Sequence, residues 1–331
     1  MRLSPPPLRG RVREGGGVTN FSDPVRVRSN TPIESHDLRK EYGRGRTALA
    51  GASLRVEQGE VFGFLGANGA GKTTFVKMLL GLVRPTSGTA RLFGRPIHEP
   101  AARALVGYQP ELFRFPEWMT GEEVLRLHGQ LAHVAATDVA AAAPGALERV
   151  GLGGRGRDRV GTYSKGMQQR LALAQALVAH PRLVILDEPT SALDPVGRRE
   201  VREIIRDLRG EGVAVFLNSH LLSEVELTCD RVAILHEGRV VREGQLDELL
   251  RATTELHVTV DAVTPAVLEA VRLLALNIRA DGRSLDLELE SLEAVPAVAR
   301  AVQAAGADLL ELTPKQNTLE DVFIGIVRPP Q

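Results

Sequence analysis

Short apolar runs without charged residues recur between residues 33 and 250, separated by stretches with helical spacing of apolar positions. Runs of four or five such residues, bounded by polar ones, are typical of strands buried on both faces. Four of them are clear: Val61–Leu65, Leu183–Leu186, Val213–Leu217 and Val232–Leu235. Their alternation with helical stretches predicts an α/β domain over residues 32–250 with a mostly parallel sheet.

The strand pattern stops between residues 112 and 180. Apolar residues there follow helical spacing instead, as Val124, Leu127 and Leu131 do. We therefore predict a helical subdomain over about residues 112–180, inserted into the sheet domain.

The last part of the chain, residues 251–331, changes pattern again. Leu256, Val258 and Val260 alternate with polar residues, which predicts a half-buried strand. The segments that follow are a helix from Thr264-Pro265, a short extended run at Ile278, an alternating strand Leu285–Leu289, a helix from about Leu292 to Gly306 and a strand Leu309–Leu312. This βαββαβ order predicts a small α+β ferredoxin-like accessory domain, and a final helix is expected over Thr318–Val327. No catalytic group stands out in it, so we expect a partner or regulatory surface.

Residues 1–31 show no apolar periodicity and contain Pro5–Pro7, Gly15–Gly17, six arginines and two acids. Such a composition cannot bury enough apolar surface to fold, so we predict a disordered basic tail. Contact of the tail with anionic lipid is the alternative.

The composition excludes several classes of protein. Basic and acidic residues balance at 41 each, which argues against a nucleic-acid coat protein or a polybasic membrane binder. Cys229 is the only cysteine, which excludes a disulfide framework and a cysteine-ligated zinc site. No window approaches 18 uninterrupted apolar residues, and the N-terminus lacks the order of a signal peptide. We therefore expect a soluble intracellular chain.

A glycine-rich loop directly follows the run Val61–Leu65. Its residues are Gly66, Ala67, Asn68, Gly69, Ala70, Gly71, Lys72, Thr73 and Thr74. The loop matches GxxxxGK[ST] and lies between a predicted strand and a predicted helix, the setting of a phosphate-binding loop. Its backbone N–H groups and the helix N-terminus would surround phosphate. We predict that Lys72 reaches the β- and γ-phosphates and that the Thr73 hydroxyl ligates Mg²⁺.

Two carboxylates, Asp187 and Glu188, end the run Leu183–Leu186. Sites in parallel sheets form at the carboxyl ends of strands, so we predict that Asp187 meets the Mg²⁺ held by Thr73. Glu188 is then placed to activate the water that attacks the γ-phosphate, as a general base. GTPases usually read guanine through Asn-Lys-x-Asp, and no Asn precedes a Lys in this chain, so the expected nucleotide is ATP.

Ser164 stands before an apolar helical stretch that includes Leu171, Ala174 and Leu177, in the position of an N-cap. Gly166 lies nearby, and a capped helix start of this kind is also an anion site. The residues alone favour ordinary capping and leave anion binding open.

The order of these motifs resembles that of the nucleotide-binding subunit of an ATP-binding cassette (ABC) transporter, over about residues 33–250. Gly66–Thr73 resembles the Walker A motif, and Leu183–Glu188 resembles Walker B with its catalytic glutamate. The further matches, with the roles that the resemblance implies, are Tyr42 stacking on adenine, Gln109 as the Q-loop ligand of nucleotide and Mg²⁺, Ser191–Asp194 as the D-loop, and His220 as the catalytic switch histidine.

The signature motif departs from the family pattern. Tyr163–Met167 stands in place of Leu-Ser-Gly-Gly-Gln, so the signature role is carried over to Ser164 and Gly166 alone. The variant resembles the branch that works with ABC-2-type export permeases. The segment Thr318–Phe323 resembles the same branch, in which a small accessory domain follows the cassette.

The resemblance implies an ATPase that powers a separate ABC-2-type membrane permease from the cytoplasmic face of the cell membrane. Two such cassettes, in a homodimer or a heterodimer, would close over two ATP molecules, with Ser164 and Gly166 of each chain capping the γ-phosphate held by the other. The first alternative is a soluble ABC ATPase acting on DNA or ribosomes. It would typically carry two cassettes or a long coiled coil, and the zero net charge also argues against nucleic acid. The second is a non-catalytic regulatory module, against which Lys72, Asp187 and Glu188 speak. The sequence names no cargo.

Overall fold

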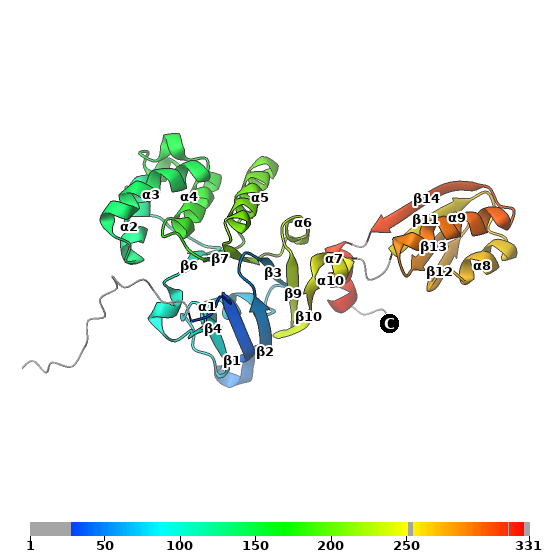
Figure 1. Cartoon of the computed structure of the whole chain (residues 1–331), viewed down its shortest axis with the longest axis horizontal. Helices are drawn as coiled ribbons and strands as arrows, with labels where there is room; N and C mark the ends of the chain where they lie inside the picture. The colour runs from blue at the N-terminus through cyan, green and yellow to red at the C-terminus, as the bar shows by residue number, and fades with distance from the viewer. Residues whose placement is uncertain (1–27, 251–253, 317, 328–331) are drawn as a thin grey trace, which may run out of the picture.

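The computed structural model describes residues 28–250, 254–316 and 318–327. Two sheets form its framework, one of ten strands, β1–β10, and one of four strands, β11–β14 (Figure 1). The predicted fold class, an α/β domain with a small α+β domain after it, is confirmed. Within the described residues, no helix combines the length and the apolar character needed to cross a bilayer.

The large sheet has the strand order β5-β4-β1-β2-β10-β9-β3-β8-β7-β6. Its strands are β1 Ile33–Tyr42, β2 Arg46–Val56, β3 Val61–Gly66, β4 Ser87–Leu92, β5 Arg95–Pro96, β6 Val106–Gln109, β7 Leu183–Asp187, β8 Ala214–Asn218, β9 Arg231–His236 and β10 Arg239–Gln245. Parallel pairs run from β9 through β3, β8 and β7 to β6. Four of them, β3, β7, β8 and β9, carry the apolar runs that were predicted, whereas β6 was not predicted.

The other side of the large sheet is mostly antiparallel, which the sequence pattern did not predict. β1 pairs with β2 and with β4, and β4 pairs with β5. The strand β1 alternates buried with half-exposed or exposed residues, whereas β7 and β8 are buried throughout. Strands that are open on one face form no continuous apolar run, so the pattern of buried strands missed them.

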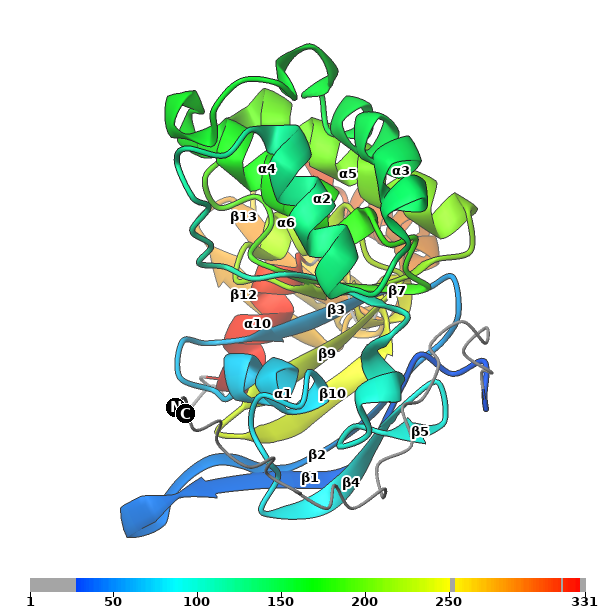
Figure 2. The same cartoon turned by 90° about the vertical axis from the view of Figure 1, so that its left-hand side faces the viewer.

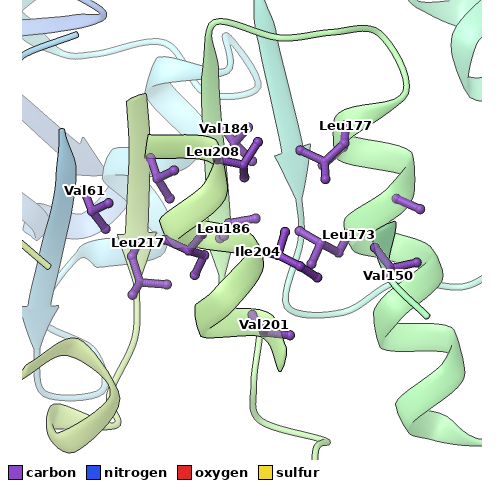
Figure 3. Packing of buried hydrophobic residues seen from close by; sticks show 14 of the residues in the cluster. Val61, Val150, Leu173, Leu177, Val184, Leu186, Val201, Ile204, Leu208 and Leu217 are labelled. Atoms are coloured by element: carbon purple, nitrogen blue, oxygen red, sulfur yellow. The ribbon is translucent and has the colours of Figure 1, made fainter. Parts of the chain in front are cut away.

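Helices cover both faces of the large sheet. α1, Lys72–Leu79, lies on one face, and α5, Pro195–Gly210, lies with the helical subdomain on the other (Figure 2). Successive residues of a strand point to opposite faces, so each buried strand feeds two cores. In β3, Val61 belongs to the core under α5, and Phe62 belongs to the core around α1. Figure 3 shows the first of these cores, in which Leu173 and Ile204 pack over the sheet.

Three helices form the subdomain predicted over residues 112–180: α2 Gly121–Leu131, α3 Ala136–Arg149 and α4 Lys165–Leu177. A capping box starts α2, because Thr120 and Glu123 exchange backbone and side-chain hydrogen bonds. Ser164 starts α4, where its hydroxyl accepts a hydrogen bond from Met167 N at 3.2 Å, so its predicted capping role is confirmed. Outside this subdomain, two short helices, α6 Leu222–Glu226 and α7 Leu246–Leu250, follow β8 and β10 along the chain.

The small sheet has the order β12-β13-β11-β14 and its own core. Its elements are β11 Thr254–Val260, α8 Pro265–Arg272, β12 Asn277–Asp281, β13 Ser284–Leu289, α9 Val295–Ala304 and β14 Leu309–Gln316. The order is therefore βαββαβ. The helix expected from Leu292 starts at Val295, after a single 3₁₀ turn over Leu292–Ala294, with Pro296 in its first turn.

The last helix, α10 Leu319–Val327, packs on α6 and α7 instead of on the small sheet (Figure 1). Leu319 is fully buried in the core under α5, and its N–H donates to Glu226 Oε2 at 2.9 Å. The domain limits at residues 31 and 250 stay predictions. Residues 1–27 of the predicted tail lie outside the described residues, and the N–H groups of Arg28 and Ser29 both donate to Phe93 O.

Replacing Leu319 by Ala tests the attachment of α10. The side chain is fully buried, so we expect the free energy of unfolding to fall by about 2–5 kcal/mol, with a lower Tm in thermal unfolding. Leu273→Ala is the control, because that side chain is 91% exposed and its loss should change stability by less than about 0.5 kcal/mol. Equal stability of the two variants would show that α10 does not pack stably on the domain of the large sheet.

Candidate functional site

The glycine-rich loop joins β3 to α1, as the sequence predicted. Gly71 is the N-cap of α1 with φ of 111°, a conformation that residues with a side chain rarely adopt. A Cβ at this position would also lie 2.3 Å from Ala48 O, so the loop needs a glycine there for two reasons. The chain therefore turns tightly enough to aim the first N–H groups of α1 into the loop, which is the geometry of an anion site.

Lys72 is buried, and its ammonium lies inside the loop. Its Nζ donates to Gly66 O at 2.6 Å and to Ala67 O at 3.3 Å. An ammonium has three donors, so one remains for a phosphate oxygen. Burial lowers the pKa of Lys72, and the nearby carboxylates of Glu188 and Asp187 oppose that shift. The positive charge of Lys72 is therefore close enough to Asp187 and Glu188 to attract both carboxylates.

A pocket of about 350 Å³ opens over the loop. It is lined by Tyr42, Arg46, Thr47, Ala48, Ala67, Asn68, Gly69, Gly71, Lys72, Thr73 and Thr74. The antiparallel strands β1 and β2 bring Tyr42 and its neighbours to the loop, although they are far from it in the sequence. Tyr42 is 42% exposed, and Lys40 Nζ lies 5.0 Å from the centre of its ring. An open aromatic face beside a phosphate loop suits a nucleotide base.

Asp187 is the last residue of β7 and is 3% exposed. Asn218, the last residue of the neighbouring strand β8, donates its side-chain N–H to Asp187 Oδ1 at 2.5 Å. Burial raises the pKa of Asp187 to about 6, and the hydrogen bond from Asn218 opposes that rise. A carboxylate this buried is costly unless a cation is bound beside it.

Glu188 follows Asp187 in a left-handed conformation, with φ of 52°. Its Oε1 accepts the N–H of His220 at 2.9 Å and lies 2.7 Å from His220 Nδ1. Its backbone is held by Asn218 O, which accepts the N–H of Glu188 at 2.9 Å, and by Gln169, whose Nε2 donates to Glu188 O at 3.2 Å. A strained backbone that several contacts maintain is typical of a functional residue.

Gln109 is the last residue of β6, beside β7, and is fully buried. Neither the oxygen nor the nitrogen of its amide has a hydrogen-bond partner. Such an orphaned buried amide is expensive, so a ligand for it is expected. Together with the Thr73 hydroxyl and the Asp187 carboxylate, it offers the oxygen atoms that Mg²⁺ prefers, and the donor set fits this metal. No group of three His, Cys, Asp or Glu side chains that suits a metal occurs among residues 28–250, 254–316 and 318–327.

Ser164 and Gly166 line a different pocket, of about 440 Å³, together with Ala192, Leu193 and Asp194. These residues do not line the pocket over Lys72. Within one chain the structure therefore brings Tyr42 and the loop to one pocket and the two signature residues to another.

Three further residues contact the site and were not predicted: Asn218, Ser219 and Gln169. Asn218 contacts Asp187, Ser219 Oγ lies 3.4 Å from Glu188 Oε2, and Gln169 bonds the backbone of Glu188 and Pro189. A signal existed for the first two, because they follow the predicted strand Val213–Leu217 and polar residues at strand ends gather at one edge. Gln169 lies mid-helix, with no local signal.

The chain is similar to known proteins. A family model described as ABC transporter matches residues 49–191. The chain is 37% identical over 303 residues to the daunorubicin resistance ATP-binding protein DrrA3 of Streptomyces coeruleorubidus, covering 89% of this chain and 96% of that protein. It is also 37% identical over 294 residues to the Nod factor export ATP-binding protein I of Paraburkholderia xenovorans, covering 88% and 95%.

A solved ATP binding subunit of an ABC transporter has a TM-score of 0.61 and 31% identity, covering 66% of this chain and 92% of that one. The two relatives above match along nearly their whole length, beyond the residues of the family model. The phosphate loop and the strand-end carboxylates both lie within residues 49–191, the part that the family model matches. The chain therefore belongs to the ATP-binding proteins of ABC transporters.

Proposed function

We propose that this ATP-binding protein hydrolyses ATP to drive export through a separate ABC-2-type permease. The observation that carries the proposal is the pair Asp187 and Glu188 at the end of β7, beside Lys72 in its loop and with His220 on Glu188. A carboxylate that holds Mg²⁺ also serves nucleotide binding, but a second buried carboxylate placed as a general base is needed only for hydrolysis.

ATP is the proposed substrate, and the pocket of the phosphate loop is its proposed site. The adenine stacks on Tyr42, and the phosphates lie along Gly66–Thr74, with Lys72 on the β- and γ-phosphates. Positioning of this kind lowers the activation free energy of hydrolysis, because the loss of translational and rotational entropy is met on binding.

Thr73, Gln109 and Asp187 would hold Mg²⁺. When bound, the metal neutralises charge on the β- and γ-phosphate oxygens. Asp187 and Gln109 end the adjacent strands β7 and β6, so the strand ends present both of them at one edge of the sheet.

Glu188 acts as the general base for the attacking water. His220 Nδ1 lies 2.7 Å from Glu188 Oε1, so the histidine orients the carboxylate. The backbone N–H of His220 also donates to Glu188 Oε1 at 2.9 Å, which holds the carboxylate beside the histidine.

A complete site needs a second cassette, of the same or of a different chain. The separation of Ser164 and Gly166 from the phosphate pocket supports this, since each pair then caps the γ-phosphate bound by the partner. The N-terminus of α4, which Ser164 caps, is a suitable anion site for that contact.

Export through a permease is supported by the relatives, one of which is named for Nod factor export and one for daunorubicin resistance. The variant signature and the segment Thr318–Phe323 favour the ABC-2 branch. We place the protein at the cytoplasmic face of the membrane, bound to its permease, with no nucleic acid as partner.

The direct test is release of phosphate from ATP by the purified chain, with and without Mg²⁺. We expect release only with Mg²⁺, and a faster rate when the proposed ABC-2-type permease is present in vesicles. Nucleotide binding without any phosphate release, even with the permease, would reduce the function to ATP binding.

The pKa of Asp187 predicts how Mg²⁺ binding depends on pH. Below about pH 6 this carboxyl holds a proton in the metal-free protein, and Mg²⁺ has to displace it. The Mg²⁺ concentration for half-maximal binding of a fluorescent ATP analogue should therefore rise roughly tenfold per pH unit below that value, and stay constant above it. The same titration of the free nucleotide corrects for protonation of its own phosphate. A constant requirement from pH 7.5 to 5 would show that Mg²⁺ does not compete with a proton on Asp187 in this range.

A further inference from the structure

Asn218 occupies a central place in the sheet that neither the motifs nor the catalytic roles above explain. It is the last residue of β8, 2% exposed, and it pairs with Phe64 of β3 on one side and with Asp187 of β7 on the other. The strand β3 leads into the phosphate loop, and β7 ends in the carboxylates. Asn218 therefore lies between the two halves of the site.

The side chain of Asn218 makes one short bond and leaves one atom unpaired. Its Nδ2 donates to Asp187 Oδ1 at 2.5 Å, and its Oδ1 is buried without any hydrogen-bond partner. An ionised carboxylate only accepts, so the nitrogen is the atom that faces Asp187. The amide oxygen then has to find its donor elsewhere, because an unpaired buried acceptor is costly.

Both features suit a residue that orients a metal ligand. A donor on Oδ1 fixes the carboxylate plane of Asp187 and leaves Oδ2 for a cation. A free acceptor at the same place suits a metal-bound water, which has protons to donate. Groups that hold metal ligands in this way typically change metal affinity 10–100-fold when they are lost.

We propose that Asn218 is a positioning residue for the Mg²⁺ of the nucleotide, acting through Asp187 and through a metal-bound water. The proposal rests on the proposed function, because it uses the assignment of Asp187 as a Mg²⁺ ligand. It assigns Asn218 no contact with the phosphates, so nucleotide binding without the metal does not depend on it.

The test is Asn218→Leu, which keeps the size of the side chain and removes both polar atoms. Binding of a fluorescent, non-hydrolysable ATP analogue is measured in EDTA and then across a Mg²⁺ titration. We expect the Mg²⁺ concentration for half-maximal binding to rise about 10–100-fold, with the affinity in EDTA unchanged within twofold. A Mg²⁺ requirement within twofold of the parent, or an equal loss of affinity in EDTA, would overturn the proposal.

Two further variants keep the test decisive. Asn218→Ala also lacks the amide and cannot clash, so it replaces the Leu variant if that one does not fold, with the same expected shift. Ser35→Ala is the control, because Ser35 is also 2% exposed and hydrogen-bonded but contacts the backbone of Leu54 in β2 instead of any residue of the site. Its Mg²⁺ requirement should equal that of the parent, and a shift as large as that of the Asn218 variants would refute a specific role for Asn218.

The same titration separates this inference from the function on which it rests. If the parent protein binds the analogue equally with and without Mg²⁺, the proposed Mg²⁺ site itself is wrong. If binding by the parent depends on Mg²⁺ and both Asn218 variants need the same Mg²⁺ concentration as the parent, the Mg²⁺ site stands and only the proposed role of Asn218 is wrong.

Discussion

Glu188→Gln is expected to bind ATP and to hydrolyse it about 10²–10⁴ times more slowly than the parent. Gln keeps the size of Glu and its capacity to accept the N–H of His220, but its amide cannot take a proton from water. The left-handed turn at this residue should persist, because Asn218 O and Gln169 hold the backbone and not the carboxylate. Phosphate release under single-turnover conditions measures the change.

Glu203→Gln is the control for this experiment. Glu203 lies on α5 and is exposed, with Arg199 as its ion-pair partner, so its loss should leave hydrolysis unchanged. Hydrolysis by Glu188→Gln at the parent rate would show that Glu188 is not the base.

The same variant also tests the second cassette. ATP that binds and is not hydrolysed should trap two chains face to face, so gel filtration with ATP and Mg²⁺ should shift Glu188→Gln toward twice the mass of the chain. Adding Ser164→Arg should cancel the shift, because a large cation in the pocket of Gly166 and Ala192 blocks the contact in trans. An inactive variant that stays monomeric with its permease present would contradict the composite site.

Lys72→Ala is expected to remove most of the affinity for ATP. The ammonium is the only side-chain cation within the loop Gly66–Thr74, and hydrogen bonds of charged groups contribute about 1.5–3 kcal/mol. That range corresponds to a 10- to 100-fold weaker binding of ATP, to be measured by titration with a fluorescent analogue. The affinity for AMP, which lacks the β- and γ-phosphates, should fall far less in the same variant.

Lys77→Ala provides the matched control, because Lys77 lies on the same helix, is exposed and points away from the buried face of α1. Its affinity should equal that of the parent. If Lys72→Ala also binds ATP within twofold of the parent, the loop is not the phosphate site.

Several features were predictable because neighbouring residues determine them. The loop Gly66–Thr74 carries its own strand, glycines and helix start, so its place between β3 and α1 follows from a short stretch of sequence. Ser164 capped α4 as expected, since capping depends only on the next three residues. The strand ending in Asp187 was visible as an unbroken apolar run.

Other features depended on contacts between distant residues, and no local pattern encodes them. The bond from Asn218 to Asp187 spans 31 positions, and that from Leu319 to Glu226 spans 93. The last helix reads as an ordinary amphipathic segment, and only packing decided that it joins the cassette and not the small sheet.

The sequence by itself therefore determined the phosphate loop, the strand-end carboxylates and the two kinds of domain, because each depends on residues next to one another in the chain. Only the tertiary structure decided that Asn218 at the end of β8 bonds Asp187, that the antiparallel strands bring Tyr42 to the loop, and that α10 packs on α6 and α7. The physical reason is that strand order and helix packing follow from burying apolar surface across the whole molecule, and many pairings satisfy the same local pattern.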